Sequence, residues 1–84
     1  MAGAIDWRRV AETTLHPTQV EILEAMAACD RLSPAEFCSN GEALSRVAYH
    51  FRALKRVGLL EAAGSAQKRG AVEHYYRLSR DARN

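Results

Sequence analysis

Apolar side chains recur at helical spacing in several stretches of the first 57 residues. The clearest stretch covers residues 43–57, where one apolar stripe is formed by Leu44, Val47, Ala48, Phe51 and Leu54. Polar and basic residues occupy the other positions, which is the pattern of a helix with one buried side. The same spacing in weaker form predicts helices over residues 5–14 and 17–29.

Local signals mark where the predicted helices begin and end. Pro17 suits the first turn of a helix, because its missing N–H would have no partner there. Ser33 and Glu36 have the spacing of a capping box, which predicts a short third helix from residue 34. Residues 39–41 are expected to stop that helix, and Gly58 is expected to end the fourth in a left-handed conformation.

Two short strands are predicted after the helices, over residues 59–63 and 71–78. In the second strand, every other residue falls on one face, namely Val72, His74, Tyr76 and Leu78. His74 is therefore expected to pack with Tyr76 and Leu78. Residues 64–70 form a basic, glycine-bounded loop between the strands, and residues 79–84 are expected to fray.

These elements predict one mostly α domain over residues 1–84, with the order α-α-α-α-β-β. An N-terminal helix precedes a three-helix core, and a β-hairpin follows. This is the order of a winged helix-turn-helix, with the helix-turn-helix over residues 34–57 and the wing over residues 59–78. A length of 84 residues leaves no room for a second domain of ordinary size.

Charge is distributed unevenly along the chain, although the net charge is only +2. Residues 1–42 contain three basic and seven acidic residues, whereas residues 43–84 contain nine basic and three acidic residues. The second half contains both the fourth helix and the hairpin. A polyanion is the natural partner of such a surface, and a merely solvated basic face is the alternative.

Composition excludes several other classes of protein. No run approaches the roughly 18 apolar residues of a membrane span, and charged residues near the N-terminus argue against a secretory signal. We therefore expect a cytoplasmic, nucleoid-associated protein without membrane contact. An enzyme is not expected, since the sequence has no paired carboxylates, phosphate loop or Ser/His/Asp arrangement. No cofactor or small-molecule ligand is evident.

Three segments resemble ArsR-like winged helix-turn-helix regulators. Residues 47–61 are similar to that family's recognition helix and first wing strand, residues 69–78 to its second wing strand, and residues 33–36 to its helix-turn-helix entry. The similarity extends from about His16 to Leu78. It implies a homodimeric, sequence-specific binder of double-stranded DNA, usually a transcriptional repressor, with helix 43–57 in the major groove.

The resemblance also implies roles for individual residues. Base edges would be contacted by Ser45, Arg46, Tyr49 and His50. Arg52, Lys55 and Arg56 would contact phosphates or support the helix, and Lys68 and Arg69 would contact adjacent DNA from the wing. For His50 an alternative is equally open, namely a partly buried role that locks the helix against the wing.

The chain departs from the family pattern in two places. Ala48 stands where the family's recognition helix usually has a second serine. The chain also stops soon after Leu78, where many relatives have a further helix for dimerisation. The first helix is therefore the expected dimer interface, through Ile5, Trp7 and Val10. For Trp7, a position in the core is the open alternative.

Metal binding is not expected. Some relatives have a Glu-x-Cys-x-Cys site on the third helix, but the corresponding residues 36–40 contain one cysteine, Cys38. Cys29 and the histidines add no recognised ligand spacing, so both cysteines are expected to pack as small apolar residues.

Two other functions stay open on the same fold: a non-specific architectural DNA-binding protein, and a winged-helix module for protein–protein contacts.

Overall fold

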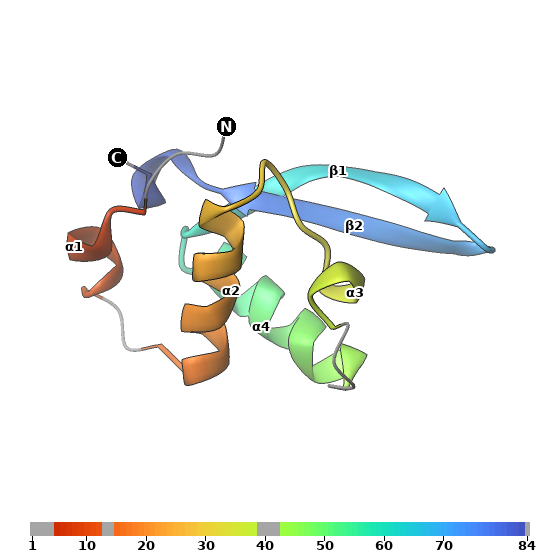
Figure 1. Ribbon diagram of the computed structural model, residues 1–84, viewed down its shortest axis with the longest axis horizontal. Coiled ribbons are helices and arrows are strands. Elements are labelled where there is room, and N and C mark those ends of the chain that lie inside the picture. The colour runs from red at the N-terminus through yellow and green to blue at the C-terminus, as the bar shows by residue number, and fades with distance from the viewer. Residues whose placement is uncertain (1–4, 13–14, 39–42, 84) are drawn as a thin grey trace.

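Over residues 5–12, 15–38 and 43–83, which the structure describes, the computed structural model contains four α-helices, an antiparallel hairpin and a 3-10 helix (Figure 1). The elements are α1 (Trp7–Val10), α2 (Pro17–Ala27), α3 (Pro34–Phe37), α4 (Leu44–Arg56), β1 (Leu60–Lys68), β2 (Ala71–Leu78) and η1 (Arg80–Ala82). The predicted order of four helices and two strands is confirmed, and η1 is added at the end. No helix within the described ranges is long and apolar enough to cross a membrane.

Side-chain caps mark the starts of α1, α2 and α3, whereas α4 begins after Ala43 without one. The Ser33 hydroxyl accepts a hydrogen bond from the Glu36 N–H at 3.1 Å, and the Glu36 carboxylate accepts one from the Ser33 N–H at 3.0 Å. This is the predicted capping box. The expected stop at residues 39–41 lies outside the described residues. Gly58 has the predicted left-handed conformation at the end of α4, with φ of 87°.

The first two helices are shorter than predicted. The Asp6 carboxylate accepts hydrogen bonds from the N–H groups of Arg8 and Arg9, so α1 begins only at Trp7. It ends at Val10, whereas residues 13–14 of the predicted helix lie outside the described residues. Helix α2 ends at Ala27, two residues before the predicted end.

The first strand is longer than predicted, because it continues through most of the expected loop. Beyond an irregular register between Ala62 and Ser65, β1 pairs with β2 up to Lys68 opposite Ala71. Only Arg69 and Gly70 form the turn, both with positive φ, as two-residue hairpin turns require. Polar residues and Gly64 indicated a loop, but a glycine inside a strand is also typical of a bulge.

The core lies between α2, α4 and the base of the hairpin. Phe51 is fully buried, and its ring centroid lies 6.1 Å from that of Phe37 and 5.3 Å from that of Tyr76. Phe51 therefore joins α4 to both α3 and β2. Around it pack buried side chains from α2, α4 and the hairpin: Ile22, Leu23, Met26, Val47, Leu54, Leu59, Leu60 and Leu78.

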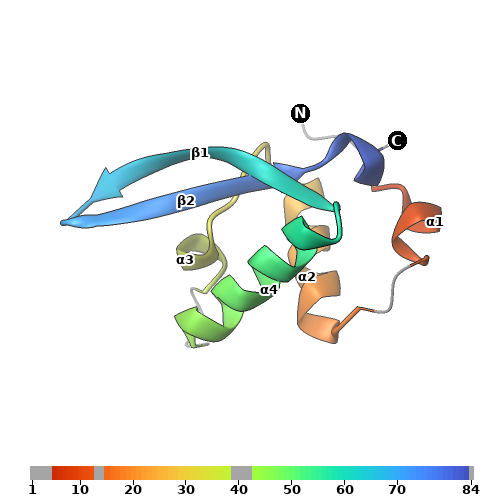
Figure 2. The ribbon, with the colours of Figure 1, turned by 180° about the vertical axis from the view of Figure 1, so that it is seen from behind.

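The buried side of α4 is rotated relative to the predicted stripe. Leu44 is 53% exposed, because the first turn of α4 lies at the edge of the molecule (Figure 2). Ala48 is only half-buried. The buried residues of α4 are Val47, His50, Phe51 and Leu54.

The expectation that residues 79–84 fray is wrong for residues 79–83, the part that the structure describes. The Ser79 hydroxyl donates a hydrogen bond to the Gly58 carbonyl at 2.6 Å, and Ala82 is fully buried. The Ala82 carbonyl accepts a hydrogen bond from the Asp6 N–H at 2.8 Å. Helix η1 therefore lies beside α1, at the opposite end of the molecule from the hairpin turn (Figure 1).

Candidate nucleic-acid interface

One side of α4 faces away from the rest of the protein. Ser45, Tyr49, Arg52 and Arg56 are all exposed, and their spacing of four, three and four residues places them along one face of a helix. This outward face is opposite to the buried side of α4. The Tyr49 side chain is 54% exposed, although a tyrosine ring has much apolar surface to bury.

Within the described residues, the basic side chains of α4 have no ion-pair partner. Its basic residues Arg46, Arg52, Lys55 and Arg56 are exposed and form no ion pair with any other described residue. Residues 44–56 contain no aspartate or glutamate that could compensate them. The helix therefore presents cations without an ion-pair partner in the described part of the chain, together with the hydroxyl groups of Ser45 and Tyr49.

The two predicted cations of the hairpin differ in their surroundings. The Lys68 ammonium lies 3.1 Å from a carboxylate oxygen of Glu73, and the Tyr75 hydroxyl donates to the same oxygen at 2.7 Å. Hydrogen bonds from Tyr75 and Lys68 lower the pKa of Glu73, and interactions with Tyr75 and Glu73 raise the pKa of Lys68. Arg69 is exposed at the turn and has no ion pair within the described chain.

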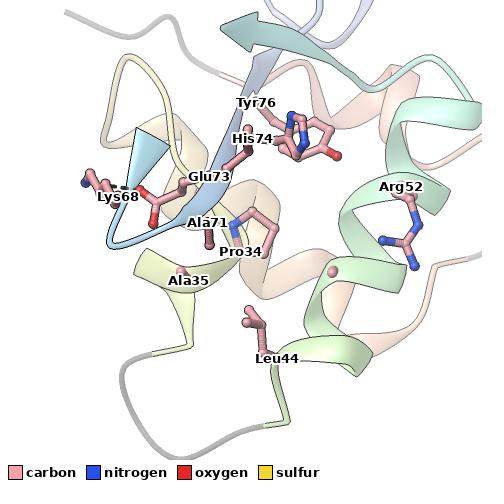
Figure 3. Close-up of a pocket in the computed structure, with 11 residues that line it drawn as sticks. Pro34, Ala35, Leu44, Arg52, Lys68, Ala71, Glu73, His74 and Tyr76 are labelled. Carbon is pink, nitrogen blue, oxygen red and sulfur yellow. Dashed lines mark ion pairs between the residues drawn. The ribbon is translucent and has the colours of Figure 1, made fainter. Parts of the chain in front are cut away.

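A groove with a volume of about 270 Å³ lies between the hairpin, α3 and α4 (Figure 3). Its apolar walls include Leu44 from α4 and Val72 from β2, which are 53% and 56% exposed. Arg52 lines it from α4, and Lys68 with Glu73 from the hairpin. The remaining lining residues are Pro34, Ala35, Ala48, Ala71, His74 and Tyr76.

This groove is positioned by a backbone connection between β2 and the segment before α3. Leu32 and Tyr76 exchange two N–H to carbonyl hydrogen bonds of 2.9 Å. The sequence does not mark Leu44 and Val72 as site residues, because apolar residues in a periodic pattern are typical of a core. A hint was available in the position of Leu44, at the very start of the apolar stripe.

His50 does not lie on the outward face of α4, so the expectation that it faces bases is wrong. It is only 7% exposed. Its Nδ1 lies 3.0 Å from Nε2 of Gln19, and its ring stacks on that of His16 with a centroid distance of 4.6 Å. The buried alternative is the one observed, but the contact is with α2 and its cap rather than with the hairpin.

His74 of β2 does not pack with Tyr76 and Leu78, so that prediction is wrong. His74 is exposed in the groove, because the hairpin extends beyond the helices and only its base reaches the core. Tyr76 and Leu78 do pack there. On the opposite face, Tyr75 is 5% exposed, and the Arg31 guanidinium lies 4.1 Å from its ring centroid.

The predicted dimer residues differ in how much of each is exposed to solvent. Ile5 and Val10 are 6% and 4% exposed, because α1 and η1 enclose them within the chain's own core. Their assignment to an intermolecular surface is therefore wrong for this structure. Trp7, in contrast, is 46% exposed.

Within the described ranges, no three residues among the histidines, cysteines and carboxylates are grouped in a way that could hold a metal ion. The Cys29 thiol donates a hydrogen bond to the Ala25 carbonyl at 3.1 Å. Cys38 is half-buried and packs against the core.

No family model matches the sequence, and no curated protein matches it. The structure is similar to the crystal structure of Rv0081 from M. tuberculosis, with a TM-score of 0.62 and 21% sequence identity. The similarity covers 87% of this chain and 65% of that chain, so the present chain spans just under two thirds of the length of Rv0081. At this identity the similarity shows a shared fold alone.

Proposed function

We propose that the protein is a winged helix-turn-helix regulator of transcription, similar to the ArsR-like family, that binds double-stranded DNA. In this proposal α3 and α4 form the helix-turn-helix, and the β1–β2 hairpin is the wing. The proposal rests chiefly on the outward face of α4, which combines exposed hydroxyl groups with cations that form no ion pair among the described residues.

Helix α4 would enter the major groove, which is about 12 Å wide and admits an α-helix. Ser45, Arg46 and Tyr49 lie in its first half and would contact base edges, since guanidinium and hydroxyl groups can bond to bases. Arg52, Lys55 and Arg56 lie further along and would neutralise phosphates. His50 has no direct role, because it is buried against α2.

The groove between α4 and the hairpin has the chemistry of a site for one DNA strand. A nucleic-acid backbone presents apolar deoxyribose carbons beside anionic phosphates. The exposed side chains of Leu44 and Val72 would contact sugars, while Arg52 would contact phosphate. Arg69 would reach adjacent DNA from the hairpin turn. Lys68 would contribute less, because Glu73 already pairs with it.

The family resemblance further suggests repression by a homodimer. Trp7 is the predicted interface residue that remains exposed. A dimer of this kind binds two half-sites that are separated by about 10 base pairs, one turn of DNA, or a multiple of that distance.

Selection from random DNA duplexes, followed by salt titration of the enriched site, tests the proposal. We expect an enriched sequence with two half-sites. If Arg52, Lys55, Arg56 and Arg69 neutralise about four phosphates, log K should fall against log salt with a slope of about −3.6 per protomer.

Other results would select the other functions. Salt-dependent binding without an enriched sequence would indicate a non-specific architectural protein and contradict the assignment of base readers. No DNA binding at low salt would contradict the proposal altogether and favour a module for protein contacts.

A further inference from the structure

Two histidines meet where the start of α2 packs against the middle of α4. His16 precedes α2 as its cap, and His50 is on the buried side of α4. Their rings stack with a centroid distance of 4.6 Å and an interplanar angle of 29°. Gln19, in the first turn of α2, contacts both residues.

The hydrogen bonds define which ring nitrogens lack a proton. The Gln19 side-chain oxygen accepts a hydrogen bond from the backbone N–H of His16 at 3.2 Å, so the Gln19 amide nitrogen faces His50. That amide nitrogen can only donate, and therefore Nδ1 of His50, at 3.0 Å, must accept. Likewise Nδ1 of His16 accepts from the Thr18 N–H at 3.1 Å. Both Nδ1 atoms are unprotonated in this arrangement.

A proton on either Nδ1 would remove a hydrogen bond. On His16 it would replace the acceptor that caps α2 with a donor that faces the Thr18 N–H. On His50 it would face the Gln19 amide, which is a donor, at a site of 7% exposure. Two imidazolium rings at the observed separation would also repel each other.

The groups around His50 do not offset this cost. The charged groups that act on it are His16, from the cap of α2, and Arg46, from α4 itself, and both oppose its protonation. The Tyr49 ring lies edge-on at 5.4 Å. Helix α3 and strand β1 also pack against α4, and in the described part of the chain neither contributes a charged group that acts on His50.

We propose that His16, Gln19 and His50 form a proton-sensitive contact that holds α4 against α2 at neutral pH and releases it in acid. Arg46 and Tyr49 flank His50 on α4. Loss of the contact therefore alters the support beneath the residues that face outward.

The direction of the pH dependence follows from the folded state. Burial, then His16 and Arg46, lower the pKa of His50 below its ordinary value of 6.5. Between pH 6.5 and the lower folded-state pKa, the unfolded chain consequently binds a proton that the folded chain excludes. The contribution of neutral His50 to the free energy of unfolding is fully present above pH 6.5 and is lost as the pH falls through the folded-state pKa.

Equilibrium unfolding between pH 5 and 8 tests the proposal, with His50→Asn as the main variant. The asparagine side-chain oxygen can replace Nδ1 as acceptor and does not titrate in this range. We expect the unfolding free energy of the parent to depend more steeply on pH than that of His50→Asn, by up to about one proton per molecule. His74→Asn is the matched control, since it removes a histidine that is exposed on the hairpin, and it should keep the parent's slope.

Equal slopes for the parent and His50→Asn would overturn the proposal. Should His50→Asn not fold, NMR titration of the parent decides instead. A His50 midpoint below 6.5, with the neutral ring protonated on Nε2, supports the contact. A midpoint at or above 6.5, or a proton on Nδ1, contradicts it.

The consequence for DNA rests on the proposed function and is measured separately. At constant ionic strength, the affinity of the parent for its selected site should fall from pH 7.5 to 5.5 by a larger factor than that of His50→Asn. Protonation of exposed histidines would instead strengthen DNA binding. Absence of DNA binding at every pH would contradict the proposed function and leave the unfolding result as an independent measurement.

Discussion

Basic side chains of this protein fall into two groups according to what they contact. Arg9, Lys68 and Arg77 lie within 4 Å of carboxylates on neighbouring residues or strands. Exposed ion pairs of this kind contribute little to stability, but the carboxylate offsets the positive charge of its partner. The basic residues of α4 have no such partner within the described residues, so their charge is available to a phosphate.

Arg52→Ala and Arg77→Ala test this distinction, because each removes one arginine from an exposed position. Arg52 lines the groove, whereas Arg77 lies 2.7 Å from Glu61 at the base of the hairpin. We expect Arg52→Ala to weaken DNA binding and to reduce the salt slope by about one. Arg77→Ala should leave the slope nearly unchanged in the same titration. Equal losses would contradict the assignment of phosphate contacts to α4.

Among the elements, α3 depends most on its cap. A helix of four residues has little hydrogen bonding of its own, so the reciprocal bonds of Ser33 and Glu36 define where it starts. Its first residues, Pro34 and Ala35, form one wall of the groove. Loss of the cap would therefore disturb the groove as well as the helix.

Ser33→Ala should lower the unfolding free energy by about 1–2 kcal/mol, because the Glu36 N–H loses its acceptor at a fully buried position. Each kcal/mol corresponds to about 4–8 °C in melting temperature for a domain of this size. Ser45→Ala is the matched control at an exposed position and should change the free energy by less than about 0.5 kcal/mol. Thermal unfolding of both variants gives the comparison, and similar shifts would show that the cap is unimportant.

At the scale of the whole molecule, the two ends of the described chain close one side of the core. Ile5 pairs with Arg83 as an isolated β-bridge, and the fully buried Ala82 lies beside them. Ser79 connects this end to the turn after α4 through the Gly58 carbonyl. The C-terminal segment is thus part of the fold rather than an appendage.

Ala82→Asp should destabilise the protein by about 3 kcal/mol, because it places a carboxylate at a site with no exposure. Asp81→Ala changes the neighbouring, exposed residue and should stay within about 0.5 kcal/mol. Chemical denaturation of the two variants measures the difference. A frayed C-terminal segment would give two equal and small effects.

Some features of this protein followed from local sequence alone. The capping box of Ser33, the left-handed Gly58, the bounds of β2 and the concentration of charge in residues 43–84 depend on short-range geometry or composition, and each could be predicted. The exposure of the basic residues of α4 followed in the same way, from helical periodicity.

Other features required the tertiary structure, because they depend on residues that are distant in sequence. His50 is buried because Gln19 of α2 and His16, the cap of α2, pack against it. Its position in the periodic pattern allowed either a buried or a DNA-facing role. Arg31 stacks on Tyr75, and residues 79–83 pack because α1 offers an apolar surface. Periodicity predicts which side chains share a face of an element. Only the packing of the elements decides which face is buried and which basic side chains meet a carboxylate.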